Sequence, residues 1–321
     1  MYLRQVGANT VRLYNITYNI PYNIMLNFIP QRGSIAMIEY RKLQHEDYDD
    51  IADICKDIWD GTDYLPEVFH AWVDDSGLFM GAVDTDTGKV IGVDKYSVLH
   101  DGTGWLEGLR THKDYRGKGI GKELALRLFK VTLEDLRAGR INKVAFSTHI
   151  SAVESIGMMK QLGFRLEQSY IFIEKEYTAV NSTLNTKDFS IESWKPSYEE
   201  FAGLPYLRRR AGVLPFAFYF QKPTPELHRE LLEQNCFLSI NGHKGLFKLK
   251  GEPHFIVFDE SFEGINAYMN YYLLLLAGKC PTPPLTSIMP EDLELIDALK
   301  AAGFGAIEPW ICDYLYYTYS E

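Results

Sequence analysis

The chain has 321 residues, which is long enough for two domains of ordinary size. Hydrophobic residues make up 46% and charged residues 24%, as is typical of a globular protein with a buried core. The net charge of −10 argues against nucleic acid as the main partner, because phosphate backbones bind basic surfaces.

Four cysteines lie far apart, and none forms a Cys-x-x-Cys pair. The eight histidines show no spacing typical of a metal site, so the sequence predicts no metal. Scattered thiols are typical of a reducing compartment, and no apolar run is long enough to cross a bilayer. We therefore expect a cytoplasmic protein, monomeric or homodimeric, that binds neither membrane nor nucleic acid.

Residues 1–36 contain arginine but no acidic residue, and Asn and Pro residues interrupt their apolar positions. A secretory signal needs a continuous apolar segment, which this stretch does not provide. We expect a disordered extension that precedes the first strand, which begins after Met37.

Beyond Met37, hydrophobic periodicity and turn residues predict an alternation of strands and helices. Strands are predicted at 38–43, 78–83, 90–99, 105–111, 142–148 and 165–177, and helices at 47–59, 66–73, 123–137 and 151–162. This order predicts an α/β domain built on a mixed sheet.

Residues Asp114–Lys122 read Asp-Tyr-Arg-Gly-Lys-Gly-Ile-Gly-Lys and lie between the predicted strand 105–111 and the predicted helix 123–137. Glycines allow the backbone to turn sharply and to point several N–H groups into one concavity. The helix N-terminus adds unsatisfied N–H groups and a partial positive charge. Arg116, Lys118 and Lys122 add full charges, so the segment predicts a phosphate-binding loop.

Two other phosphate loops do not fit this segment. The dinucleotide fingerprint requires Gly-x-Gly-x-x-Gly, whereas the chain has Gly117-x-Gly119-x-Gly121. The nucleoside triphosphate loop requires Ser or Thr where the chain has Glu123. Arg-x-x-Gly-x-Gly after a strand instead resembles the pyrophosphate loop of the GCN5-related N-acetyltransferase (GNAT) superfamily, which binds acetyl-CoA.

The predicted order of elements between Ile38 and Tyr177 is also similar to that of the superfamily. A narrower resemblance, to its histidine N-acetyltransferase-like branch, rests on three segments: Asp60-Gly-Thr-Asp-Tyr-Leu-Pro66, His70-Ala-Trp72 and Leu106-Glu-Gly-Leu-Arg110. The resemblance implies the acyl-CoA N-acyltransferase fold, acetyl-CoA as cosubstrate, and direct attack of an amine on the thioester.

The resemblance also implies which residues bind the two substrates. Pantetheine would pair with the backbone of strand 105–111, and the pyrophosphate would lie on the loop. The implied cofactor residues are Leu109, Arg110, Thr111, Arg116, Gly117, Lys118, Gly119, Ile120, Gly121, Lys122 and Ser155. In the family, the helix–helix loop and the closing strands form the acceptor site, which implies Asp63, Tyr64 and Tyr170 as substrate residues.

Glu107 is the only carboxylate on strand 105–111, at a position where family members often carry the general base. Regular alternation would place Glu107 on one face with Leu109, and Arg110 on the other. Met159 stands where many members carry a tyrosine that protonates the thiolate. Ser155 is an alternative donor to the sulfur, and the thiolate could also leave unprotonated.

The second half of the chain repeats the pattern of the first. Met158-Met-Lys-Gln-Leu-Gly-Phe164 recurs as Ala298-Leu-Lys-Ala-Ala-Gly-Phe304, each before an aromatic strand, at 170–172 and 310–312. Further strands are predicted at 236–240, 245–249, 254–258 and 285–289, and helices at 262–277 and 291–301. In this register 116–121 falls on 256–261, which contains no glycine and no basic residue.

We therefore predict two tandem units, of which the second is degenerate. The predicted ranges are an extension at 1–36, a GNAT domain at 37–180 and a GNAT-like domain at 188–321. The expected function is acetyl-CoA-dependent N-acetylation of a small amine, for example an amino acid such as histidine. Its carboxylate would pair with Arg110, Arg41 or the run Arg208–Arg210.

Two alternatives remain open at this point. One is an acyl-CoA-binding regulatory module without turnover, which the absence of Tyr at Met159 favours and the presence of Glu107 disfavours. The other is a protein or peptide N-acetyltransferase.

Overall fold

The computed structural model describes residues 37–176, 183–249, 253–276 and 285–321, so the predicted extension at 1–36 lies outside the described residues. The chain divides into two compact units, one that ends at Val144 and one that spans Ala145–Glu321. The predicted boundary between 180 and 188 falls partly outside the described residues. The predicted domain ranges therefore stay a prediction.

The first unit is a sheet of antiparallel strands in the order β1-β2-β3-β4. These strands are β1 (Ile38–Lys42), β2 (Leu78–Asp84), β3 (Val90–Val98) and β4 (Thr103–Thr111). The helices are α1 (Tyr48–Cys55), α2 (Leu65–Asp74) and α3 (Ile120–Arg137). Every residue of β2 is buried, because helices cover both faces of the sheet.

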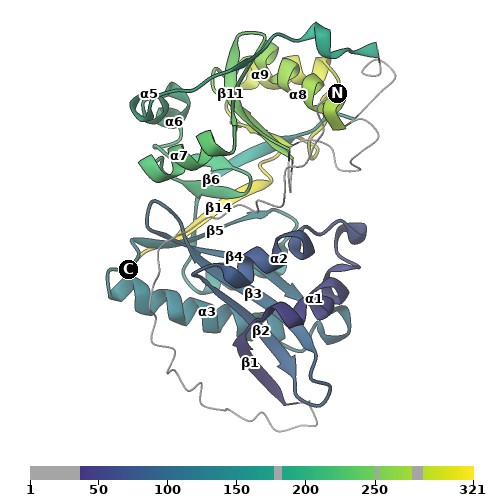
Figure 1. The fold of residues 1–321 in the computed structure, drawn as a ribbon, viewed down its shortest axis with the longest axis vertical. Coiled ribbons are helices and arrows are strands. Elements are labelled where there is room, and N and C mark those ends of the chain that lie inside the picture. Colours follow the sequence, from purple (N-terminus) through teal and green to yellow (C-terminus); the bar gives the residue numbers. More distant parts are fainter. Residues whose placement is uncertain (1–36, 177–182, 250–252, 277–284) are drawn as a thin grey trace. The chain divides into compact units, whose positions relative to one another are not determined.

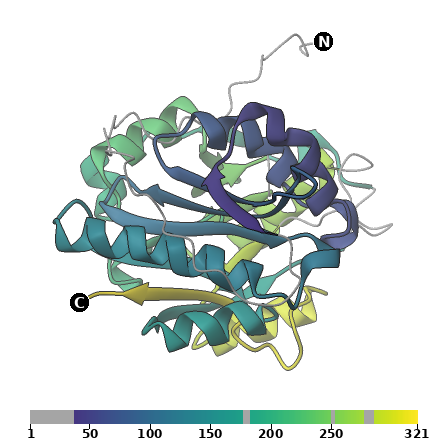
Figure 2. The same ribbon diagram turned by 90° about the horizontal axis from the view of Figure 1, so that it is seen from below.

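The helices are divided between the two faces of this sheet. A Cβ atom on Gly92 would meet Ile120 and Leu124 of α3, whereas a Cβ atom on Gly108 would meet Trp72 of α2. Figure 2 shows the same arrangement, with α3 on one side of the strands and α1 and α2 on the other. The site residues predicted on β4 can therefore face either helix layer.

The second unit contains two groups of strands. The first has the order β5-β14-β6-β13, and the second is antiparallel in the order β12-β11-β10-β7. The strands are β5 (Lys143–His149), β14 (Tyr314–Tyr319), β6 (Arg165–Ile173), β13 (Thr286–Ile288), β12 (His254–Val257), β11 (His243–Lys248), β10 (Phe237–Ile240) and β7 (Ile191–Ser193). A hairpin, β8 (Leu214–Phe216) and β9 (Tyr219–Gln221), stands apart from both groups.

Two hydrophobic clusters stabilise the second unit, and Figure 1 shows their helices on opposite sides of β10–β12. One cluster includes residues of α8 (Phe262–Leu276) and α9 (Leu293–Ala301). The other includes residues of α5 (Tyr198–Ala202), α6 (Pro205–Arg209) and α7 (Pro225–Glu233). The remaining helix, α4 (Val153–Gln161), lies between β5 and β6 in the sequence.

The predicted order of elements from 38 to 173 is confirmed, with small differences at the ends. Helix α1 ends at Cys55 rather than 59, because the chain turns into a short 3₁₀ helix at Trp59–Gly61 in which Trp59 has a φ of 48°. Helix α3 begins at Ile120 rather than 123. The short elements between 191 and 233 were not predicted from the sequence.

The predicted strand at 310–312 is wrong. Trp310 has a φ of 64°, which an extended strand does not allow, and its N–H donates to Ile307 in a turn. The indole of Trp310 is buried against the α8–α9 cluster instead. The strand begins at Tyr314, where β14 pairs antiparallel with β6 and places Tyr314 opposite Tyr170.

His254 is buried in the core of the second unit, with only 1% of its surface exposed. Its ring makes edge contacts with Phe216 and Phe172. Burial disfavours the charged imidazolium and lowers the pKa of His254 to about 3. The native protein therefore holds a neutral imidazole at neutral pH.

We predict that this histidine makes the stability depend on pH. Between pH 6.5 and about 3 the unfolded chain binds a proton at His254 that the native chain does not, so stability is complete above pH 6.5 and falls as the pH decreases. The loss at pH 5 amounts to about 2 kcal/mol. Urea unfolding of wild type and His254→Leu at pH 7 and pH 5 measures it. The variant should lose less stability between the two pH values, and equal losses would contradict the prediction.

Candidate active site

Strand β4 contains a β-bulge next to the predicted base. The register of the β3–β4 pair shifts between Val93–Arg110 and Lys95–Glu107, so Gly108 and Leu109 both lie opposite Asp94. Gly108 has a φ of 79°, which glycine adopts without the steric cost that a side chain would bring. The bulge interrupts the β3–β4 ladder within the strand whose backbone was expected to pair with pantetheine.

The bulge also corrects the predicted arrangement of side chains on β4. Glu107 and Arg110 both face the layer of α1 and α2, where they bond to Lys95 and Asp63. Leu109 faces α3, because its Cδ1 lies 3.8 Å from the position of a Cβ atom on Gly121. The expectation that Glu107 and Leu109 share a face is therefore wrong, since the extra residue reverses the alternation after Glu107.

The loop between β4 and α3 has the geometry expected of an anion cradle. Gly117 and Gly119 have φ values of 74° and 83°, and a Cβ atom at either would have no heavy atom within 4 Å. Gly119 is the N-cap residue of α3 and provides no side chain to bond the first N–H groups of the helix. Arg116 donates from Nε to the carbonyl of Thr111 at 3.2 Å, which fixes the start of the loop.

The charges of the loop are accessible to a ligand. Arg116, Lys118 and Lys122 are exposed, whereas Ile120 is buried and anchors the first turn of α3 to the core. The Lys118 ammonium lies 4.5 Å from the centre of the Tyr115 ring, and the Tyr115 hydroxyl donates to Asp84 at 2.6 Å. The residues present therefore fit a pyrophosphate group, which would accept N–H bonds from the helix end and pair with the basic side chains.

Glu107 is held in a buried polar cluster. Its Oε1 accepts a hydrogen bond from the Ser97 hydroxyl at 3.1 Å and lies 3.3 Å from the Lys95 ammonium. Lys95 in turn bonds to Asp75, which caps the C-terminus of α2. The predicted base is therefore bonded to its neighbours on β3 rather than exposed on a solvent face.

A second carboxyl group lies opposite the bulge. Asp94 is fully buried, and its Oδ1 accepts the backbone N–H of Lys95 at 3.0 Å. Burial raises the pKa of Asp94 well above its ordinary range, and the nearby charge of Glu107 adds to this effect. Burial thus favours the protonated form of Asp94, which lies next to Lys95 on β3.

Arg110 and Asp63 form an ion pair on the α1–α2 side of β4. Arg110 donates to the two oxygens of Asp63 at 2.8 and 3.3 Å, and the Asp63 side chain has no exposed surface. The guanidinium lies over Trp59 and Tyr64, at 4.8 and 5.8 Å from the ring centres. Of the two substrate residues predicted here, Asp63 is thus occupied by Arg110, and Tyr64 lines a partly exposed aromatic stack.

The thiol nearest this pair is not a nucleophile at neutral pH. Burial raises the pKa of Cys55 to about 12, and the neighbouring Asp63 carboxylate contributes to the increase. A covalent thiol mechanism at Cys55 is therefore disfavoured, which is in keeping with direct attack by the amine.

Ser155 and Tyr170 belong to the second unit. Ser155 is half-buried in the first turn of α4, one turn before the buried Met159. Tyr170 is 2% exposed, and its hydroxyl donates to Gln168 at 2.6 Å. Burial raises the pKa of Tyr170. A direct role for Tyr170 in contact with substrate has no support from this buried position.

The sequence reasoning did not single out His149, which lies at the end of β5 just before α4. Its Nδ1 is 2.7 Å from the Ser151 hydroxyl, and its Nε2 is 3.7 Å from Oδ2 of the buried Asp313. Asp313 also accepts the backbone N–H of Phe172 at 2.7 Å. Because Asp313 comes from the segment before β14, far along the chain, no local pattern could have indicated this pair.

The arginines expected to bind a substrate carboxylate are bonded within the protein. Arg41 donates to both oxygens of Asp47 at 2.7 Å. Arg209 pairs with Glu260 and Asp292, and Arg210 pairs with Glu260. These contacts stabilise the fold, and a substrate carboxylate would have to displace a protein carboxylate to use them.

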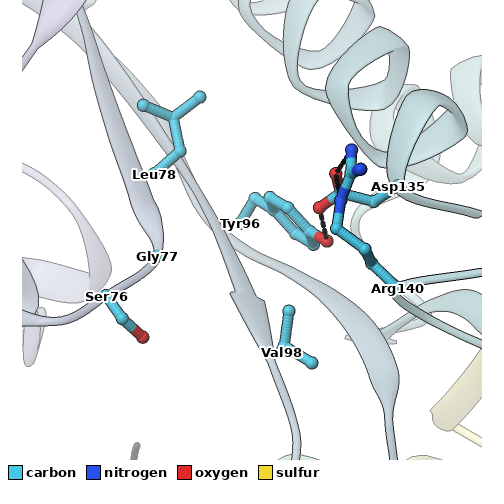
Figure 3. A pocket seen from close by; sticks show the side chains of 7 residues that line it. All are labelled: Ser76, Gly77, Leu78, Tyr96, Val98, Asp135 and Arg140. Atoms are coloured by element: carbon cyan, nitrogen blue, oxygen red, sulfur yellow. Dashed lines mark hydrogen bonds and ion pairs between the residues drawn. The ribbon is translucent and has the colours of Figure 1, made fainter. Parts of the chain in front are cut away.

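A pocket in the first unit lies away from the loop (Figure 3). Tyr96 and Val98 line it and pair with Leu106 and Gly104 at the start of β4, whereas the loop follows Thr111 at its end. Asp135 closes one side, accepting from the Tyr96 hydroxyl at 2.6 Å and from Arg140 Nε at 2.8 Å. This pocket is therefore not the predicted phosphate site.

The described part of the chain contains neither a cluster of metal-ligating side chains nor a membrane-spanning helix. Within 37–176, 183–249, 253–276 and 285–321, no group of three or more His, Cys, Asp or Glu side chains is arranged to hold a metal ion. None of the helices in the same ranges has the length and apolar character needed to cross a bilayer.

The antiparallel strands, the bulged β4 and the glycine loop at the start of α3 together define the class of acyl-CoA N-acyltransferase folds. Residues 39–164 match the acetyltransferase (GNAT) family. Over these residues the chain is therefore similar to the GNAT family.

The chain is similar over a limited segment to a protein of known activity. It is 34% identical over 93 residues to the histidine N-acetyltransferase of Oreochromis niloticus, and this segment covers 29% of the chain and 27% of that protein. The chain thus spans about a quarter of the length of this relative.

Two solved structures are similar over most of the chain. A Pyrococcus horikoshii protein has a TM-score of 0.58 at 14% identity, covering 92% of this chain and 93% of its own. A GCN5-related N-acetyltransferase from Sphaerobacter thermophilus has a TM-score of 0.55 at 13% identity, covering 88% and 95%. At these identities the likeness shows that the fold is shared.

We predict that CoA stabilises the protein against heat and that Gly119→Val abolishes this effect. A β-branched residue at a φ of 83° is strained and would distort the cradle. At 100 times its dissociation constant, a ligand adds about 2.7 kcal/mol to the stability of the native state. The measurement is the melting temperature with and without CoA.

Gly139→Val is the matched control. Gly139 has a φ of 67° and open space around its Cβ position, but it lies at the opposite end of α3. It should lower the melting temperature of the free protein yet keep the shift with CoA. If Gly119→Val also keeps the shift, the loop is not the phosphate site.

Proposed function

We propose that the protein is an acetyl-CoA-dependent N-acetyltransferase that acts on the amine of a small molecule, for example an amino acid such as histidine. The observation that carries the proposal is the conjunction of a bulged β4 with the open Gly117–Gly119 cradle at the N-terminus of α3. The GNAT family match over residues 39–164 supports acetyl-CoA as the donor. The name of the Oreochromis niloticus relative supports histidine as the first acceptor to test.

In the proposed reaction the amine nitrogen forms a bond to the acetyl carbon, the carbon–sulfur bond breaks, and the proton lost by the amine passes to Glu107. Acetyl-CoA supplies the acetyl group, and CoA leaves as the thiolate, which then takes a proton from water. The loop from Arg116 to Lys122 binds its pyrophosphate, and backbone N–H groups at the Gly108–Leu109 bulge donate to the oxygen that becomes negative. Direct attack requires no nucleophilic side chain, which agrees with the unreactive Cys55.

The proposal keeps the second half as a degenerate GNAT-like unit without cofactor binding. Its strands β7, β10, β11 and β12 are followed by α8, β13 and α9, the order of the corresponding elements in the first half. Asp259 and Glu260 occupy the connection between β12 and α8, where the first half has its glycine loop. The four residues of this connection, Phe258 to Ser261, include no glycine and no basic residue that could bind a phosphate group.

We predict that Glu107→Gln lowers kcat by roughly a hundredfold, because the amide cannot accept the proton of the amine. The shift in melting temperature caused by CoA should stay as in wild type, since the phosphate loop is unchanged. Steady-state measurement of CoA release across pH checks both statements. Turnover near the wild-type value at every pH would remove Glu107 from the chemistry.

We also predict that free histidine has a higher kcat/KM than histidine methyl ester and a higher value than a short peptide with N-terminal histidine. The experiment measures thiol release from acetyl-CoA with each acceptor. A preference for the peptide would favour the peptide N-acetyltransferase reading. Stabilisation by acetyl-CoA without thiol release, with any amino acid or polyamine, would favour a regulatory module that binds acyl-CoA.

A further inference from the structure

The cluster around Glu107 contains an ammonium group that is almost completely buried. Lys95 has a side-chain exposure of 2%, and it lies directly opposite Glu107 in the β3–β4 ladder. Its Nζ is 2.8 Å from Asp75 Oδ2 and 3.3 Å from Glu107 Oε1, and it also donates to the Ser97 hydroxyl. A charge removed from water in this way is tolerated only where carboxylates compensate it.

Two successive hydrogen bonds lead from Lys95 through Ser97 to Glu107. Lys95 donates to Ser97, and Ser97 donates to the same Glu107 oxygen that Lys95 approaches. The ring of Trp72 lies 4.9 Å from the Lys95 ammonium and shields it from the side of α2. The position of Glu107 Oε1 is therefore fixed by two donors on β3.

Other ionisable side chains also lie near Glu107 and Lys95, and each affects the electrostatics of this pair differently. Asp75 at the end of α2 competes for the ammonium. Burial raises the pKa of Asp94 on β3, which favours its protonated form. The Arg110 guanidinium on β4 is compensated by Asp63. Lys95 is thus a cation in direct contact with Glu107, and Asp75 competes for its ammonium group.

We propose that Lys95 is a positioning residue of the acetyltransferase, which holds Oε1 of Glu107 in place through its ammonium group, and that Asp75 competes for this ammonium. The inference rests on the proposed function for its catalytic consequence. An ammonium at this distance favours the ionised form of a carboxyl group. Oε1 of Glu107 is thereby held in a fixed position, as the acceptor of the amine proton in the proposed reaction requires.

Two variants test the proposal, because they should act in opposite directions. Lys95→Met removes the cation, so the acidic limb of the kcat/KM profile should move to higher pH by about one unit or more. Asp75→Asn keeps the shape of the side chain but removes the competing charge, so the limb should move to lower pH. Lys130→Met, at an exposed site on α3, should leave the profile unchanged. A purely structural ion pair would not produce opposite shifts.

A second readout does not depend on turnover. The carboxyl resonance of Glu107, assigned by its loss in Glu107→Gln, should titrate at higher pH in Lys95→Met and at lower pH in Asp75→Asn. If Lys95→Met does not fold, the direction in which the titration moves in Asp75→Asn still tests the proposal. An unchanged or upward shift in Asp75→Asn overturns the inference. If the titration shifts as expected but no amine is acetylated by the wild type, the electrostatic role of Lys95 stands and the proposed function fails.

Discussion

The bulge at Gly108 is the constraint on which the candidate site depends. One extra residue in β4 turns Arg110 to the same side as Glu107 and sends Leu109 towards α3. A regular strand would instead have placed Glu107 and Arg110 on opposite faces. Only glycine adopts the required φ of 79° without strain, and a Cβ atom at this position would lie 2.6 Å from the Trp72 ring.

The charged groups beside β4 and those of the loop after it therefore lie in two different environments. The α1–α2 side of β4 gathers charged groups that are nearly all compensated, in the pairs Arg110–Asp63 and Lys95–Asp75. The loop after β4 keeps its cationic side chains exposed and its first helical N–H groups without a side-chain cap. Buried, paired charges suit proton transfer, whereas exposed, uncapped donors suit an anionic ligand.

The candidate site was predictable to the extent that its residues are close in sequence. The loop Asp114–Lys122 and the base candidate Glu107 could be recognised because strand, turn and helix follow each other directly. Asp63 and Tyr64 stay predicted substrate residues, and the sequence did not indicate that Asp63 would be buried and paired with Arg110. The partners Lys95, Ser97 and Asp75 were missed, since a lysine in an apolar strand carries no sign of which carboxylate it will meet.

The sequence by itself determined the order of strands and helices from 38 to 173 and the position of the glycine loop before α3, because hydrophobic period and glycine placement are local properties. Only the tertiary structure decided the bulge, the pairing of β14 with β6, and the Asp313–His149 contact. Register and cross-strand pairing depend on residues far apart in the chain, and one inserted residue changes the face of every side chain that follows.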